Sequence, residues 1–265
     1  MTGQQSTLTA LIHGESGVGK SDLADTIPGP RLILDAEGGS EYTPSWPKQV
    51  WNPAYPPPGM PGCDPALQQV ADTVRVIVQD WQTWERVHYW LVSGNHPFTS
   101  IVLDSLTEIQ KRCRDAIRGT EQMQQQHWGE LLILMETAVR QLRDLAKSPY
   151  NRLMNVVILA LTDMNKDRGR PLVQGALQMA LPGFVDVVGY LTTQNGADGS
   201  LQRWLQVQPD GIHVAKDRTK VITYYLSQAG YIPIRDHAAP NQAAPGYSLR
   251  EAVQALETRY NTGGN

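Results

Sequence analysis

The chain has 265 residues, of which 41% are hydrophobic and 18% are charged, and its formal net charge is −3 at pH 7. This size suits one large globular domain with small appendages at most. The slight acidic excess excludes a uniformly basic nucleic-acid-binding coat, so any contact with DNA has to come from local patches. Two distant cysteines, Cys63 and Cys113, give neither a disulfide framework nor a zinc spacing, which favours a cytoplasmic location. The longest apolar run, 156–161, is too short to span a membrane, so we expect no membrane association.

A glycine-rich stretch near the start of the chain fits the phosphate-binding pattern G-x-x-x-x-G-K-[ST]. The stretch consists of Gly14, Glu15, Ser16, Gly17, Val18, Gly19, Lys20 and Ser21. A buried strand is expected before it, over 7–13, and a short helix after it, over 22–27. That order lets backbone N–H groups turn toward an anion. We expect Lys20 to reach the β- and γ-phosphates of ATP and the Ser21 hydroxyl to hold Mg²⁺.

Carboxylates follow the second predicted strand, 31–35, in the segment Asp35-Ala36-Glu37-Gly38-Gly39. Open α/β sheets bind their ligands beyond the carboxyl ends of their strands. Two interpretations are open: Glu37 polarises the water that attacks the γ-phosphate, or the two acidic residues are merely solvated in a turn. The neighbouring phosphate loop favours the first.

A proline- and glycine-rich segment, 52–65, predicts a surface loop rather than a helix or a central strand. A strand over 73–78 and a helix ending near Ser93 are expected next. The aromatic and aliphatic side chains of that helix are predicted to lie mostly on its buried side, as core rather than as a base-stacking platform. They are Trp84, Val87, Tyr89, Trp90 and Leu91.

The strand predicted over 100–104 ends in Asp104, as in the second half of a phosphate-loop site. There Asp104 would hold the Mg²⁺ shell through water, and the alternative is a plain helix cap. The next residue is Ser105, whereas many hexameric P-loop motors carry a catalytic Glu directly after this Asp. We therefore assign the catalytic carboxylate to Glu37.

Two locally basic segments are candidates for contact with single-stranded DNA. The first is the predicted helix 106–118 with the polar loop 119–126 that follows it, before a second helix over about 127–147. Its basic residues are Lys111, Arg112, Arg114 and Arg118. The second segment is the loop 164–171, which carries Lys166, Arg168 and Arg170. A solvated helix face and a solvated loop are the alternatives.

A buried strand is predicted over 155–162, and a polar residue at its end, Thr162 or Asp163, is expected to sense the γ-phosphate. The residues 173–181 predict a helix that Pro182 and Gly183 end. After it, 186–194 and 201–208 alternate in hydropathy and are joined by a turn-forming segment, which predicts an antiparallel hairpin.

A further strand is predicted over 212–215, and the cations Lys216 and Arg218 follow it. From this far edge they cannot easily bend back to Lys20, so we expect them to reach the phosphates of a neighbouring subunit. A guanidinium supplied in trans stabilises charge in phosphoryl transfer, and a plain surface pair is the alternative. The segment 224–226 is expected to extend the sheet, 232–245 to be a linker, and 248–260 to form a last helix. The expected division is a core over 1–230 and a linker with a C-terminal helix over 231–265.

These motifs together resemble the RecA/RadA-type core ATPases, above all the compact single-domain forms that bacteriophages encode beside single-strand-annealing systems. The resemblance covers about residues 7–230. GESGVGKS is similar to the RecA phosphate loop, LDAEGG to the motif whose Glu activates water, and IVLDS to the strand that ends in Asp-Ser. AKDR resembles the K-x-R pair of RadA and of DnaB-type helicases, and Thr162 stands where RecA has a γ-phosphate-sensing Gln. The basic segments 119–126 and 164–171 fall where RecA has its DNA-binding loops.

The resemblance implies an α/β fold with a RecA-like P-loop NTPase core: a mostly parallel central sheet, helices on both faces and a C-terminal antiparallel hairpin extension. It implies an ATP- and Mg²⁺-dependent recombination or single-strand-annealing factor in the cytoplasm, of the infected host if phage-encoded. The implied partners are single-stranded DNA, further copies of the chain in a ring or filament (hexameric if a ring), and a single-strand-binding protein. The alternatives are a hexameric DnaB-like helicase-type motor, a P-loop ATP-binding regulatory protein and a small-molecule kinase.

Overall fold

The computed structural model describes residues 7–43, 45, 48–147, 153–164, 168–196, 199, 201–226, 231–234 and 248–261, with the backbone alone for 224–226, 231–234, 260 and 261. Lys166 and most of the predicted linker, 235–247, lie outside the described residues.

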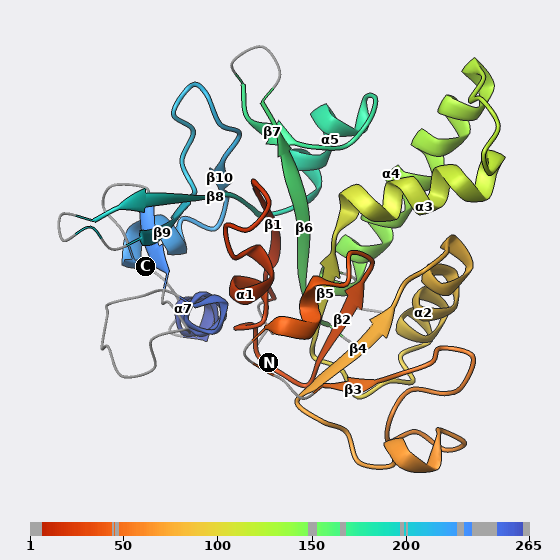
Figure 1. The fold of residues 1–265 in the computed structure, drawn as a ribbon. Helices are drawn as coiled ribbons and strands as arrows, with labels where there is room; N and C mark the ends of the chain where they lie inside the picture. Colours follow the sequence, from red (N-terminus) through yellow and green to blue (C-terminus); the bar gives the residue numbers. More distant parts are fainter. Residues whose placement is uncertain are drawn as a thin grey trace.

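A single sheet runs through the structure in the order β11-β9-β8-β1-β6-β5-β2-β4-β3 (Figure 1). The strands from β8 to β3 are parallel to their neighbours, while β9 and β11 extend the sheet antiparallel beyond β8. Two short strands lie off this path: β7 pairs with β6 and β10 pairs with β8, both antiparallel. The strands are β1 Thr9–Gly14, β2 Arg31–Asp35, β3 Gln49–Val50, β4 Thr73–Ile77, β5 Ser100–Asp104, β6 Asn155–Asp163, β7 Arg170–Pro171, β8 Val187–Asn195, β9 Leu201–Gln206, β10 Lys216–Asp217 and β11 Tyr231–Ile234.

Helices cover both faces of the sheet, because the side chains of the parallel strands alternate between two hydrophobic cores. In β6, Val156 and Ile158 belong to one core, whereas Val157 and Leu159 belong to the other. The first core is closed by α2 Trp81–Ser93, α3 Leu106–Arg118, α4 Gln125–Lys147 and α5 Leu177–Phe184, and the second by α1 Lys20–Ala24, α6 Val221–Leu226 and α7 Leu249–Asn261. The described residues also include two 3-10 turns, η1 Gly39–Tyr42 and η2 Pro65–Leu67. The predicted RecA-like α/β fold, with its antiparallel C-terminal extension, is confirmed.

Several local predictions in the C-terminal third are wrong. Ile212 to Ala215 does not form a strand, because Asp210 Oδ1 accepts hydrogen bonds from the N–H groups of Ile212 and His213 and turns the chain. The segment 224–226 is helical rather than extended, since Oδ2 of Asp217 accepts the Thr223 N–H and starts α6. Tyr231–Ile234, expected to begin the linker, pairs instead with the edge of β9.

Two further predictions about helices need correction. Helix α5 runs to Phe184 with Pro182 inside it, so the helix continues past the proline without the hydrogen bond that an N–H at this position would donate. On α2, Trp84 and Val87 are buried as expected, but the Tyr89 side chain is 68% exposed. Tyr89 follows Trp84 by five positions, which turns it away from the buried stripe.

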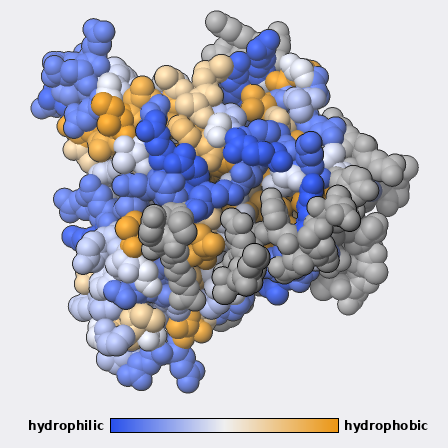
Figure 2. Space-filling model, turned by 180° about the vertical axis from the view of Figure 1, so that it is seen from behind, coloured by the Kyte–Doolittle hydropathy of each residue, from blue (hydrophilic) through white to orange (hydrophobic). Residues whose placement is uncertain are grey.

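The surface mixes hydrophilic residues with smaller hydrophobic groups, as the face turned away in Figure 1 illustrates (Figure 2). Large exposed hydrophobic side chains are distributed over several elements, such as Ile133 on α4, Met179 on α5 and Leu201 on β9. Within the described part of the chain, no helix combines the length and the apolar character that crossing a membrane requires.

Candidate functional site

The phosphate loop lies where β1 ends and α1 begins, at the carboxyl edge of the parallel strands. Gly17 and Gly19 have φ values of 81° and 89°, in the left-handed region that favours glycine. A Cβ built on Gly14, the last residue of β1, would lie 2.5 Å from the carbonyl oxygen of Leu191 in β8. The close approach of β8 therefore also requires glycine at position 14. The loop thus has the backbone that can present N–H groups to an anion.

Lys20 is 8% exposed, and its ammonium group reaches back across the loop. Its Nζ donates hydrogen bonds to the carbonyl oxygens of Gly14 at 3.1 Å and Glu15 at 2.7 Å. Burial lowers the pKa of Lys20, and the negative charges of Glu37 and Asp104 oppose that shift. A buried cation beside backbone donors fits a triphosphate, whose charge would offset the burial.

Ser21 and Asp104 join the start of α1 to the end of β5. The Ser21 hydroxyl donates a hydrogen bond of 2.6 Å to Oδ2 of Asp104. Burial raises the pKa of Asp104 to about 6, the Ser21 hydrogen bond opposes this, and the charges of Glu37 and Asp35 add to it. Hydroxyl and carboxylate oxygens suit Mg²⁺, which phosphate sites hold with few protein ligands plus the substrate. Two protein oxygens therefore fit a Mg²⁺ ion that takes its remaining ligands from the nucleotide and from water.

Glu37 is exposed on the turn after β2, and buried residues hold that turn in place. Asp35 accepts hydrogen bonds of 2.6 Å from the Gly38 N–H and from the Ser40 hydroxyl, while Arg75 lies 3.4 Å from its Oδ2. The Ser105 hydroxyl donates to Oε1 of Glu37 from the end of β5. The strand order therefore brings Glu37 to the same edge as Lys20 and Asp104.

Thr162 lies near the end of β6, one residue beyond the partner of Gly14. Its hydroxyl is 3.0 Å from Nδ1 of His13, a fully buried side chain directly before the phosphate loop. The other ring nitrogen of His13 is 2.8 Å from the carbonyl oxygen of Val214, so Nε2 donates and Nδ1 accepts from Thr162. The predicted γ-phosphate sensor thus forms a hydrogen bond with a histidine that no sequence motif singles out.

Lys216 and Arg218 lie toward the amino ends of the parallel strands, opposite the phosphate loop. Lys216 pairs with Val188 near the start of β8, and the Arg218 N–H donates to the Asp186 carbonyl just before it. Their side chains donate to carbonyl oxygens at the end of α5: Lys216 to those of Pro182 and Val185, and Arg218 to that of Gly183. The Arg218 guanidinium is also 3.5 Å from Oδ1 of Asp186, although its side chain remains 58% exposed.

The basic residues proposed to contact DNA are engaged in local ion pairs where they lie on α3. Lys111 and Arg112 pair with Glu108, Arg114 pairs with Asp115, and Arg118 pairs with Glu121. After β6, Arg168 is exposed and Arg170 lies in β7, where its guanidinium contacts the Met179 sulfur. Lys166 is outside the described residues.

Sequence reasoning missed Arg203, which comes from β9 and lies against the phosphate loop. A Cβ built on Gly19 would be 2.8 Å from Nε of Arg203, and Nη2 is 3.8 Å from Oδ2 of Asp22. No local motif marks this arginine, because it reaches the loop through the pairing of β9 with β8.

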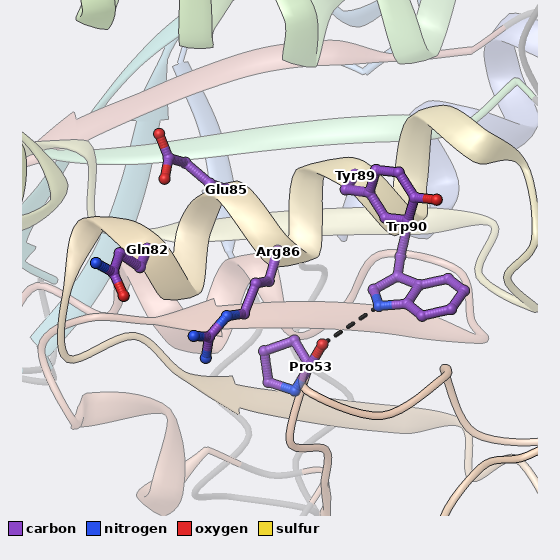
Figure 3. Close-up of a pocket in the computed structure, with 6 residues that line it drawn as sticks. All are labelled: Pro53, Gln82, Glu85, Arg86, Tyr89 and Trp90. Carbon is purple, nitrogen blue, oxygen red and sulfur yellow. Dashed lines mark hydrogen bonds between the residues drawn. The ribbon is translucent and has the colours of Figure 1, made fainter.

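A separate hollow of about 500 Å³ lies between α2 and the segment that carries Pro53 (Figure 3). Its lining includes Arg86, Tyr89 and Trp90, and the Trp90 indole N–H donates to the carbonyl oxygen of Pro53 at 3.3 Å. The proline-rich segment is therefore anchored to α2 at this point.

Comparisons with known proteins found one matching family and distantly similar solved structures. The sequence profile of the AAA domain family matches residues 6–219, and no curated protein sequence matches. One similar solved structure is a prototypical ATPase from the type III secretion system of pathogenic bacteria, with 13% identity over 71% of this chain and 52% of that chain, and a TM-score of 0.39. Another is the flagellar accessory protein FlaH from Methanocaldococcus jannaschii, with 8% identity over 86% of each chain and a TM-score of 0.44. The chain spans about half the length of the secretion ATPase.

The profile match covers the phosphate loop, Glu37, Asp104 and all strands from β1 to β10. A match over this much of the chain assigns it to a family, and the sheet order is that of the RecA-like fold. The chain belongs to the AAA domain family, and its RecA-like sheet carries the phosphate loop of a P-loop NTPase.

Proposed function

We propose that the chain is an ATP-dependent DNA recombination or single-strand-annealing factor whose ATPase is stimulated by single-stranded DNA. The observation that carries the ATPase part is the meeting of three groups at one sheet edge. The Ser21–Asp104 pair, the Lys20 ammonium and the Glu37 carboxylate come from three different strand ends. Parallel strands bring such groups to a common edge, where α/β proteins bind nucleotides.

Each of these groups has a role that follows from its chemistry. Gly14 to Ser21 bind the phosphates, with Lys20 on the β- and γ-phosphates, and Ser21 and Asp104 hold Mg²⁺. When bound, Mg²⁺ neutralises charge on the phosphate oxygens. Glu37 orients the attacking water and accepts its proton, and Thr162 senses the γ-phosphate.

Active sites shared between subunits are the second part of the proposal. Arg218 is level with Thr9, five residue steps below Gly14, which is roughly 17 Å along the strand. That separation argues against action on its own phosphate loop, and the exposed guanidinium is available to a neighbouring subunit. Lys216 and Arg218 would then complete the neighbour's site in a ring or filament, hexameric if a ring.

The DNA part rests on the resemblance to phage recombination ATPases and on the two basic segments, one on α3 and the loop after it and the other after β6. Arg168 and Arg170 follow the strand that carries Thr162, so the second segment is connected directly to the proposed γ-phosphate sensor. A core over 1–230, a C-terminal appendage over 231–265 and association with a single-strand-binding protein are part of the same proposal.

The test is the ATPase rate with and without single-stranded DNA, measured across protein concentration. We expect stimulation by DNA and a rate per subunit that rises with concentration, because neighbouring subunits share sites. An annealing assay beside a strand-displacement assay separates this proposal from a helicase-type motor. Turnover that depends on a metabolite and ignores DNA would contradict it in favour of a small-molecule kinase.

A further inference from the structure

The Arg203 side chain occupies the space that a Cβ at Gly19 would need. Besides the contact with Nε, such a Cβ would lie 3.1 Å from both Cδ and Cζ of Arg203. The Arg203 side chain thus lies against the loop at Gly19, with its guanidinium beside the carboxylate of Asp22 in the first turn of α1. Its side chain is 23% exposed, so most of this cation is held within the site rather than in solvent.

Strand register explains why Arg203 reaches the loop. Gly14 at the end of β1 pairs with Leu191 of β8, and Arg203 pairs with Thr193, two residues farther along β8. Arg203 therefore stands roughly 7 Å above the end of β1, at the height of the phosphate loop.

The strand order also determines which end of a nucleotide faces Arg203. The hydrolytic groups Asp104 and Glu37 follow β5 and β2, which lie on one side of β1 (Figure 1). β9 lies on the opposite side, two strand spacings or roughly 10 Å from β1. Because the γ-phosphate has to face the hydrolytic groups, the opposite side receives the α-phosphate and the nucleoside.

We propose that Arg203 is a nucleotide-binding residue that contacts the α-phosphate of the nucleotide held by its own subunit. A guanidinium presents a planar fork of N–H donors that matches phosphate oxygens, and it keeps its charge when buried. ATP and ADP both carry the α-phosphate, so the contact contributes to affinity for either nucleotide and not to the hydrolytic step. This inference rests on nucleotide binding at the phosphate loop and is independent of DNA.

The test compares Arg203→Gln and Arg203→Lys with the wild-type protein in equilibrium binding of fluorescent ATP and ADP. We expect Arg203→Gln to weaken both by a similar factor, about tenfold or more, and Arg203→Lys to retain part of the affinity. The matched control is Arg140→Gln, which removes a half-exposed arginine on α4 that pairs with Glu136. The control should bind both nucleotides as the wild type does.

Inorganic tripolyphosphate serves as a competitor that lacks the nucleoside. Weaker competition by tripolyphosphate in Arg203→Gln supports a phosphate contact, whereas unchanged competition with weaker ATP binding would overturn it in favour of a base or ribose contact. Loss of ATP affinity alone would also overturn the proposal, as would unchanged affinity for both nucleotides. If Arg203→Gln does not fold, the same comparisons are made with Arg203→Lys, whose unchanged affinity would reject the fork contact. Wild-type protein that binds no nucleotide would instead reject the proposed function.

Discussion

The Ser105 hydroxyl donates a hydrogen bond to Oε1 of Glu37, so the end of β5 positions a carboxylate carried by the turn after β2. The same hydroxyl oxygen accepts a hydrogen bond of 3.3 Å from the Glu108 N–H and caps α3. One side chain thus links the capping of a helix to the orientation of the proposed catalytic base.

Replacing Glu37 with Gln is expected to abolish hydrolysis while leaving ATP binding intact. The amide keeps the size of the side chain but cannot accept a proton, and loss of a general base costs roughly 100-fold or more. Single-turnover hydrolysis and equilibrium ATP binding would be measured on the same preparation. A Glu37→Gln protein that hydrolyses ATP at the wild-type rate would mean that the base is elsewhere.

Ser105→Ala is expected to lower both stability and turnover. Loss of the cap costs about 1 kcal/mol, and the rate falls because Glu37 is no longer held. Ser248→Ala is the matched control, since Ser248 caps α7 with an equal 3.3 Å hydrogen bond from the Glu251 N–H and is not one of the proposed site residues. Denaturant unfolding should show similar losses for both variants. If the two variants turn over ATP at equal rates, the Ser105 hydrogen bond does not orient Glu37 for catalysis.

The groups at the phosphate site could be predicted because they belong to short motifs with fixed spacing. GESGVGKS, LDAEGG and IVLDS each place a proposed site residue at the end of a strand or a few residues beyond it, and parallel strands bring their carboxyl ends together without further information. Arg203 and His13 could not be predicted in this way. Arg203 depends on the register of β9 on β8, and His13 on a backbone carbonyl 201 residues away.

The local errors have the same origin. Asp210 and Asp217 form hydrogen bonds with nearby backbone N–H groups, and these turns override the hydrophobic pattern of the segments that follow. The roles of all the proposed site residues remain predictions, those of the phosphate loop, Glu37, Asp104 and Thr162 as much as those of Lys216, Arg218 and the basic segments.

Gly14→Ala is expected to destabilise the protein even without nucleotide. The added Cβ would meet the Leu191 carbonyl oxygen at 2.5 Å, and a strand backbone cannot move aside cheaply. The expected loss is about 1–3 kcal/mol in denaturant unfolding. Gly189→Ala in β8 is the control, because its Cβ would meet the end of the Leu205 side chain, also at 2.5 Å, and that side chain can change rotamer. A larger loss for Gly189→Ala would refute the argument.

Arg218→Ala is expected to reduce ATP turnover without preventing assembly, since the cation acts on the neighbour's phosphates. Neither Arg218→Ala nor Glu37→Gln subunits alone should hydrolyse ATP at the normal rate. Mixing Glu37→Gln subunits with an excess of Arg218→Ala subunits should restore activity, because an Arg218→Ala subunit supplies an intact phosphate loop and Glu37 and its Glu37→Gln neighbour supplies Arg218. Sedimentation would establish that the variant still assembles. Full activity of an assembled Arg218→Ala protein would rule out the shared site.

His13 is a buried titratable group at the base of the phosphate loop. Its pKa is lowered to about 4, mainly by burial and also by the charges of His213 and Lys20, against the raising effect of the Val214 carbonyl. The unfolded chain takes up a proton near pH 6.5, whereas the folded protein does so near pH 4. The contribution of neutral His13 to the free energy of unfolding is therefore fully present above pH 6.5 and is lost as the pH falls toward 4.

His13→Gln should flatten this part of the pH–stability curve. The glutamine amide can still donate to the Val214 carbonyl but takes up no proton, so the variant is less stable at pH 7 yet loses less on acidification. At about 1.4 kcal/mol per pH unit, the interval from 6.5 to 4 corresponds to roughly 3 kcal/mol. Urea unfolding across that range measures the difference, with His127→Gln at the start of α4 as the control that keeps the wild-type slope. A His13→Gln curve parallel to the wild type would show that other groups cause the acid lability.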